Sequence, residues 1–234
     1  MRILVSIPCY LGESHTDKAI QSVINSDLLL IDNGSEPAVK EVIKKYERTQ
    51  HHKVAVIRNP ENIFVNAAWQ QAIDFFLHSN YDYLCLMNSD LILHSNYKQL
   101  LKHRWGRNPD EIILPIIQDK IDFPCSPFIA DAQEVHSGTP GVFITLNRKQ
   151  AEIISPLPDY VKIWHGDEFI YKVLRILGYK TVIPSNFFAS HYHGGSQNVQ
   201  RVKGISALIE EDKRQWELYG EKNIQEVVKK NQGL

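Results

Sequence analysis

The sequence predicts an α/β protein in which helices cover both faces of a mainly parallel central sheet. Two observations support this fold class. Short apolar runs alternate with helical stretches over the N-terminal part of the chain, and these runs are apolar throughout rather than at every second residue. The alternation indicates βαβ units, and the continuous runs indicate strands that are buried on both faces.

Four apolar runs give the predicted strands of this part, at residues 2–7, 28–31, 54–57 and 83–87. The helices predicted between them span residues 16–25, 37–48 and 65–77. Pro37 suits the first position of the second helix, because its fixed φ angle matches the helical one.

After residue 91 the alternation is lost. Further strands are predicted at residues 112–117, 142–146, 181–183 and 187–193. A helix at 167–177 ends at Gly178, a residue that commonly terminates helices. The segment 118–141 is too long for a routine connection and is predicted to be a functional loop. We expect a single domain with a first half at about 1–95, a second half at about 96–200 and a helical tail at 201–234.

Composition excludes several classes of protein. The chain has 234 residues, a net charge of −1 and a pI near 6.8, which indicates no general affinity for nucleic acid or anionic lipid. Its three cysteines cannot all pair, and no CxxC occurs. The apolar start is too short for a signal-peptide core, and no stretch has the length of a membrane-spanning helix. We therefore expect a cytoplasmic enzyme that contacts membranes at most peripherally.

Polar residues follow the predicted strands directly. Asp32 comes after the second strand, Arg58 after the third, and Asn88, Ser89 and Asp90 after the fourth. The carboxyl ends of parallel strands meet at one edge of the sheet, and such folds bind ligands there. The sequence therefore predicts that these three clusters converge in space on a ligand.

Two of these clusters admit a second interpretation. Asn88–Asp90 offers the oxygen ligands that Mg²⁺ or Mn²⁺ prefers, but Asn, Ser and Asp are also common turn residues. Asp32–Ser35 is likewise a good tight-turn sequence. Taken alone, each cluster favours a plain turn, and the strand ends are what make Asp90 a metal candidate and Asp32 a candidate for contacting a base or ribose.

Two further motifs lie in the second half. His191 and His193, at positions i and i+2 of a predicted strand, point to the same face. A single buried histidine is usually structural, but such a pair before Gly-Gly-Ser favours a metal site and a structural role about equally. Asp167 lies at the start of a predicted helix, where free N–H groups stabilise a carboxylate. It is therefore either a helix cap or a general base held at a helix N-terminus.

In this order the motifs resemble the family 2 inverting glycosyltransferases, whose nucleotide-binding fold is called GT-A. The segment 3–10 resembles the opening strand of that family, and 30–35 resembles its Val-Asp-Asp-Gly-Ser element. Asn88–Asp90 stands where the family has Asp-x-Asp. Gly166–Glu168, followed by Arg175 and Gly178, resembles the Glu-Asp element and the helix after it.

The resemblance implies roles for individual residues. The donor nucleotide would be bound by Pro8, Tyr10, Asp32, Arg58, Asn66, Asn88 and Ser89. A divalent cation, Mn²⁺ or Mg²⁺, would be held by Asp90, His191 and His193, and Asp167 would be the general base. The partners implied are a nucleotide-sugar, with UDP preferred, and a glycan or other acceptor with a hydroxyl group. We expect the long loop, with Phe123, Cys125, Phe128 and His136, to help form the acceptor site.

The chain departs from the family pattern at several places. Asn88 replaces the first Asp of Asp-x-Asp, and Gly166 replaces the Glu before the base. The Gln-x-x-Arg-Trp signature of processive polymerases is missing, which favours transfer of a single sugar.

Two alternatives remain. The replacements at Asn88 and Gly166 would also suit a catalytically degenerate relative that only binds a nucleotide or glycan. A nucleotidyltransferase normally has a Gly-rich phosphate loop after its first strand, where this chain has only Gly12. The absence of GxGxxG and GxxxxGK[ST] argues against dinucleotide oxidoreductases and P-loop enzymes.

Overall fold

The computed structural model describes residues 1–48, 53–118, 131–136, 141–192 and 204–233. The first half alternates strands and helices, as predicted: β1 (Ile3–Cys9), α1 (Glu13–Ser22), β2 (Asp27–Asn33), α2 (Pro37–Glu47), β3 (Val54–Asn59), α3 (Phe64–Leu77) and β4 (Tyr83–Met87). The predicted ranges match these elements closely except at α1, which begins and ends three residues earlier than expected.

The second half has shorter strands and more irregular connections. Its elements are β5 (Leu91–Leu93), α4 (Tyr97–Arg107), β6 (Ile112–Ile113), β7 (Ile116–Gln118), β8 (Ala132–Glu134), β9 (Phe143–Asn147), α5 (Arg148–Ile154), α6 (Gly166–Ile176), β10 (Thr181–Pro184), β11 (Phe188–His191) and α8 (Ile205–Gln232). The tail is helical, as predicted. The helices α4 and α5 and the strands β5 and β8 were not predicted.

The central sheet has the strand order β3-β2-β1-β4-β9. Its first four strands are parallel, and β9 pairs antiparallel to β4. The mainly parallel sheet predicted from the sequence is therefore confirmed. Two small three-stranded sheets, β6-β10-β8 and β5-β11-β7, extend the fold beyond it.

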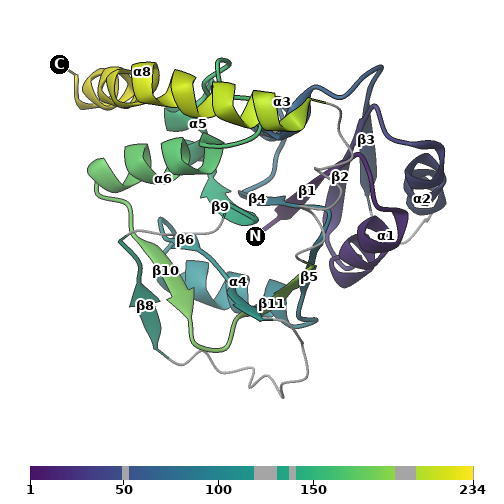
Figure 1. Cartoon of the computed structure of the whole chain (residues 1–234). Helices are drawn as coiled ribbons and strands as arrows, with labels where there is room; N and C mark the ends of the chain where they lie inside the picture. Colours follow the sequence, from purple (N-terminus) through teal and green to yellow (C-terminus); the bar gives the residue numbers. More distant parts are fainter. Residues whose placement is uncertain (49–52, 119–130, 137–140, 193–203, 234) are drawn as a thin grey trace.

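Helices cover both faces of the central sheet (Figure 1). Side chains such as Val5 and Ile7 of β1 pack on α1, α2 and α4, while Leu4 of β1 packs in a second core with α3, α5, α6 and α8. Figure 1 shows α8 (yellow) across the side of the molecule that holds α5 and α6, with α1 and α2 at the opposite end. Alternate residues of a strand point to opposite faces of the sheet, and both faces are buried. This explains why each strand is apolar throughout.

One predicted strand is wrong. Residues 112–117 form two strands, β6 and β7, which belong to different small sheets. Pro115 separates them, and proline has no N–H with which to continue a ladder. The chain therefore leaves β10, where the Leu114 N–H binds the carbonyl of Val182, and joins β11 from Ile116 onward.

Two of the cysteines are buried in the core. Cys9 and Cys85 are free thiols with no exposed surface, and burial raises the pKa of both well above the ordinary value. They are therefore small core residues rather than nucleophiles. Cys125, Phe123 and Phe128 of the predicted acceptor loop lie outside the described residues. In the described part of the chain, no helix is both long and apolar enough to cross a membrane.

Candidate active site

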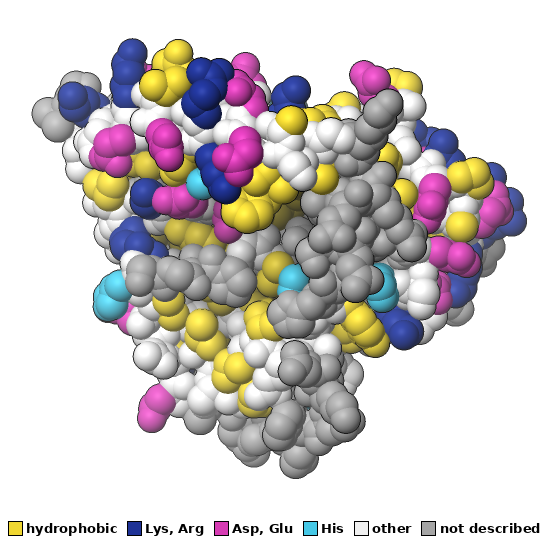
Figure 2. Space-filling view, in the orientation of Figure 1, with side chains coloured by type: hydrophobic (Ala, Val, Ile, Leu, Met, Phe, Trp, Pro, Cys, Tyr) yellow, Lys and Arg dark blue, Asp and Glu magenta, His cyan; other side chains and the backbone are white. Residues whose placement is uncertain are grey.

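A cavity of about 540 Å³ lies at the carboxyl ends of β1, β2 and β4. This size is typical of small-molecule sites. Its described wall combines strand ends with the segment before α6, and includes Pro8, Tyr10, His15, Asn33, Asn62, Phe64, Trp69, Asn88, Ser89, Asp90, Gly141, Trp164, His165, Asp167, His191 and Ile205. Figure 2 shows apolar side chains (yellow) over the central part of the face below α8, and histidines (cyan) at separate points across that face.

The structure brings most of the predicted site residues to this cavity. Pro8 and Tyr10 at the end of β1, and Asn88, Ser89 and Asp90 after β4, line it together. The pairing of β1 with β4 places these two strand ends side by side. Polar clusters that are distant in the sequence thus meet at one sheet edge.

Three predicted nucleotide residues are placed differently. The Asp32 carboxylate is buried and accepts a hydrogen bond of 2.9 Å from the backbone N–H of Ser35. Its neighbour Asn33, which sequence analysis did not select, lines the cavity instead. Arg58 is half-exposed and pairs with Glu47 at 2.6 Å.

Asn66 is the third. Its side chain is buried on α3, where its Nδ2 donates to the carbonyls of Val161 and Trp164 at 3.1 and 3.0 Å. Asp32, Arg58 and Asn66 are therefore absent from the cavity wall as far as the described residues define it.

The candidate metal ligands are only partly assembled in the described residues. Asp90 Oδ1 and His191 Nε2 lie 3.3 Å apart, because β11 pairs with β5 and aligns His191 with Leu91. Both side chains are largely buried. No group of three His, Cys, Asp or Glu side chains comes together within the described ranges, and His193 lies outside them.

Asn88 adds a third polar group near this pair. Its Oδ1 is buried and has no hydrogen-bond partner in the part of the chain that the structure describes. A carboxylate, an imidazole and an amide oxygen are ligands that suit Mn²⁺, and the first and last also suit Mg²⁺. The side chains present therefore fit a divalent cation.

Asp167 lies in the first turn of α6 and lines the same cavity. Burial raises its pKa above the ordinary value, although the backbone N–H groups of Asp167 and Glu168 act in the opposite direction. Gly141 leaves room for this carboxylate, since a Cβ atom there would lie 2.2 Å from Asp167 Oδ2. A carboxylate kept partly out of water beside a cavity is suited to accept a proton.

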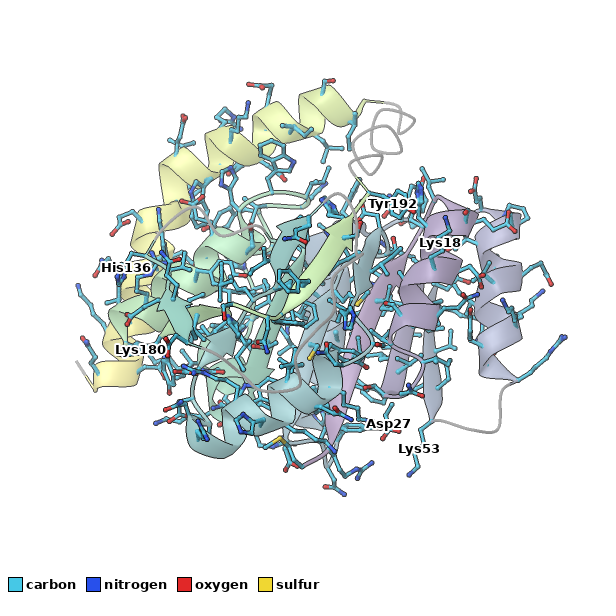
Figure 3. All side chains as sticks on the ribbon, turned by 90° about the horizontal axis from the view of Figure 1, so that it is seen from below. Lys18, Asp27, Lys53, His136, Lys180 and Tyr192 are labelled. Atoms are coloured by element: carbon cyan, nitrogen blue, oxygen red, sulfur yellow. The ribbon has the colours of Figure 1, made fainter. Side chains whose placement is uncertain are left out.

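Several polar atoms in the wall lack a partner within the described residues. His15 Nδ1, Trp69 Nε1, Asn88 Oδ1 and His165 Nε2 are all buried, and all four residues line the cavity. Because buried polar atoms are usually hydrogen-bonded, a bound ligand is a natural source of these partners. At the rim, the ring of His15 stacks on Tyr192 at 4.7 Å, and Lys18 lies beside Tyr192 (Figure 3).

Gly166, one of the departures from the family pattern, has a structural explanation. A Cβ atom at Gly166 would lie 2.2 Å from Oδ1 of the buried Asn66. The Asn66 amide is held in place by its bonds to the 161–164 segment, so it has no room to withdraw. A glycine at this position is therefore required by packing.

Fold and site together define an α/β protein with a small-molecule cavity at the carboxyl ends of its parallel strands. The family model described as "Glycosyl transferase family 2" matches residues 4–124, just over half of the 234 residues, and the chain belongs to this family. A search among curated protein sequences finds no match.

Solved structures share the fold. GalNAc-T7 with UDP, GalNAc and Mn²⁺ superposes with a TM-score of 0.64 at 16% identity, over 81% of this chain and 43% of that one. TarS 1–349 of S. aureus with UDP gives 0.64 at 14% identity, over 89% and 65%. The complex of the same protein with UDP-GlcNAc gives 0.65 at 14% identity, over 83% and 60%. This chain thus spans between 43% and 65% of the length of these three chains, and at such identities the likeness shows the fold alone.

Proposed function

We propose that this protein transfers one sugar from a nucleotide-sugar to an acceptor hydroxyl, with inversion at the anomeric carbon. The observation that carries the proposal is the meeting of three features in one cavity of a family 2 fold. The Asp90–His191 pair stands near the strand ends, and the partly buried Asp167 stands in the same wall. Buried polar atoms that have no hydrogen-bond partner among the described residues also line the cavity.

A divalent cation fits the first of these features. Asp90, His191 and Asn88 would hold Mn²⁺ or Mg²⁺, and His193 remains a proposed fourth ligand from the sequence. Such a cation acts as a Lewis acid that compensates charge on a nucleoside diphosphate leaving group.

Asp167 supplies the base. Its carboxylate would accept the proton of the acceptor hydroxyl as the oxygen forms a bond to the anomeric carbon and the bond to the diphosphate breaks. Because burial raises the pKa of Asp167, its carboxylate is a stronger base than an exposed aspartate. The free N–H groups of the α6 first turn hold it in place.

UDP is the preferred nucleotide of the donor. Solved relatives with this fold were crystallised with UDP and with UDP-GlcNAc, and one with UDP, GalNAc and Mn²⁺. Asn62 lines the cavity near the strand edge, and its amide N–H groups could contact a base or ribose. The Asn33 amide beside it is bonded to Asn62 and Asn59 and helps to hold this edge in place. Among the residues first proposed for the nucleotide, Pro8, Tyr10 and Ser89 keep that role in this proposal, whereas Asn88 is assigned to the cation.

Thermal unfolding with nucleotides is the first test. UDP, GDP, dTDP and CDP are each added with and without Mn²⁺ or Mg²⁺. A ligand at 100 times its dissociation constant stabilises a protein by about 2.7 kcal/mol, a shift of roughly 5–10 °C for a chain of this size. We expect a metal-dependent shift with UDP, and no shift with any of the four would refute the nucleotide site.

Hydrolysis of a nucleotide-sugar separates the enzyme from a degenerate relative. The replacement of an acidic residue by Asn88 is the observation that favours binding without turnover. Release of UDP from UDP-sugars, with water in place of the acceptor, is measured in the presence of Mn²⁺. Nucleotide binding without any release would favour the degenerate relative.

A further inference from the structure

The segment from Val161 to His165 connects the core to the proposed base. Ile163, Trp164 and His165 line the cavity, and Asp167 follows two residues after His165. Trp164 is about half-exposed at 48%. The segment precedes α6 and has no strand ladder of its own to hold it. Its backbone N–H and C=O groups therefore need partners from elsewhere in the molecule.

Asp212 of α8 provides the partners for the N–H groups. Its Oδ1 accepts from Lys162 N at 2.9 Å, and its Oδ2 accepts from Ile163 N at 2.7 Å and from Trp164 N at 3.0 Å. The residue is 1% exposed. Three N–H groups converging on one buried carboxylate form an anion-binding turn, and their hydrogen bonds are charge-assisted.

Two other contacts complete this arrangement. Trp216 lies four residues after Asp212, on the same face of α8. Its indole stacks on the His165 ring with the centroids 5.1 Å apart and the planes 8° from parallel. Gly220, one turn further on, admits this indole, since a Cβ atom there would lie 2.7 Å from its Cδ2 atom. On the opposite side, Asn66 of α3 binds carbonyls of the segment.

We propose that Asp212, together with Trp216, is a positioning residue that holds the 161–165 segment and thereby sets Asp167 for proton transfer. The inference rests on the proposed function. It gives a role in turnover to α8, which lies outside the 4–124 range matched by the family model. Neither residue lines the described cavity wall, so both act through the segment rather than by touching the substrate.

A substitution that keeps the shape of Asp212 tests this role. Asp212→Asn places one amide N–H where an oxygen accepted, so at least one of the three backbone N–H groups loses its partner. We expect kcat for UDP-sugar turnover to fall by about 100-fold, because small misplacements of reacting groups have effects of this size. UDP affinity should stay the same, since the strand-end wall is untouched. Glu211→Gln, an exposed neighbour that binds Arg214 on the same helix, is the matched control.

Hydrogen exchange gives a second measurement that does not depend on turnover. In Asp212→Asn the amides of residues 162–164 should exchange faster, while those of β1 and β4 should not change. A Trp216 pair repeats the test at another contact: Trp216→Phe keeps a ring on His165 and should retain most of the turnover, whereas Trp216→Ala should lose it. This pair decides the question if Asp212→Asn does not fold.

The outcomes distinguish this inference from the proposed function. An active wild-type protein with unchanged kcat in Asp212→Asn refutes the inference alone, even if exchange at 162–164 increases. An equal loss of UDP affinity also refutes it, because the effect would then be a general loss of the site. A wild-type protein that binds UDP but turns over no UDP-sugar refutes the proposed function, and the inference with it.

Discussion

The two walls of the cavity are built in different ways. The strand-end wall, with Tyr10, Asn33 and Asp90, lies at or just beyond the ends of strands that are paired with their neighbours in the central sheet. The opposite wall is the 161–165 segment, which makes five of its backbone hydrogen bonds with the side chains of Asp212 and Asn66.

Because of this difference, we expect the two walls to respond differently when a side chain is removed. In the strand-end wall, removing one side chain removes one contact, because the ladder still fixes the others. In the opposite wall, the Asp212 side chain accepts from three backbone N–H groups, so we expect its removal to shift the segment as a whole. We therefore expect substitutions in the first wall to change binding, and those near the second wall to change turnover.

The largest effect should come from the proposed base itself. Asp167→Asn keeps the shape of the side chain but cannot accept a proton, so UDP-sugar turnover should fall by about 100-fold or more. UDP binding with Mn²⁺, measured by thermal shift, should persist. Unchanged turnover in this variant would remove Asp167 from the mechanism.

Displacing the base should have the next largest effect. Gly141→Ala puts a methyl group where Asp167 Oδ2 now lies, so the carboxylate must move. We expect turnover to drop by up to about 100-fold, with UDP affinity kept. Gly106→Ala on α4 is the control, because nothing lies within 4 Å of a Cβ there. If both variants behave alike, the close approach at Gly141 has no bearing on catalysis.

In the strand-end wall, Asp90→Ala should act on binding. Loss of the carboxylate beside His191 removes a proposed cation ligand, so we expect metal-dependent UDP affinity to weaken by about tenfold or more. Titration of UDP at fixed Mn²⁺ measures this effect. Affinity for UDP without metal should be the same in both proteins, and a loss there would contradict the proposed ligand role.

The burial of Asp167 should also affect stability as a function of pH. Its pKa is raised in the folded protein, so the folded state holds this proton more tightly than the unfolded chain does. The resulting contribution to stability is complete at low pH and is lost as pH rises through the raised pKa. Asp167→Asn does not ionise, so its free energy of unfolding should exceed that of the wild type more at neutral than at acidic pH. Urea unfolding at both pH values measures the difference, and an identical difference at both would contradict it.

The smallest effect is expected at Arg58. Its guanidinium and the Glu47 carboxylate form a pair in which both side chains are well exposed, and such pairs contribute less than about 1 kcal/mol. Arg58→Ala should therefore leave UDP affinity and stability nearly unchanged. A clear loss of UDP affinity would instead favour the sequence-based assignment of Arg58 to the nucleotide.

The sequence predicted the first half of the fold more accurately than the second half. The strands β1 to β4 were recognisable because each is a short apolar run with local start and stop signals. The 112–117 strand was wrong because the two sheets that divide it at Pro115 are completed by β10 and β11, far along the sequence. The helices α4 and α5 were missed because strands and helices no longer alternate regularly after residue 91.

Individual residues of the site differ in how far the sequence alone could identify them. Asp90 and Asp167, which both line the cavity, were selected from the sequence by their positions at a strand end and a helix start. The sequence analysis selected Asp32, whereas its neighbour Asn33 lines the cavity. The sequence alone does not reveal which of two adjacent strand-end residues faces the cavity. Asp212 had no local signal, being one of several acidic residues in a charged helix. Its role depends on a segment about 50 residues earlier in the chain, which only the folded structure brings next to it.

The contact between Gly166 and Asn66 also bears on how this chain can change over evolution. A glutamate at 166 cannot be introduced by a single substitution without a clash, because its Cβ would lie 2.2 Å from Asn66 Oδ1. Shortening Asn66 first would release the carbonyls of Val161 and Trp164. Each step alone is therefore unfavourable, and the two positions are expected to show strong epistasis in a double-mutant cycle. Packing against Asn66 therefore requires glycine at position 166, independently of any role of this position in the reaction.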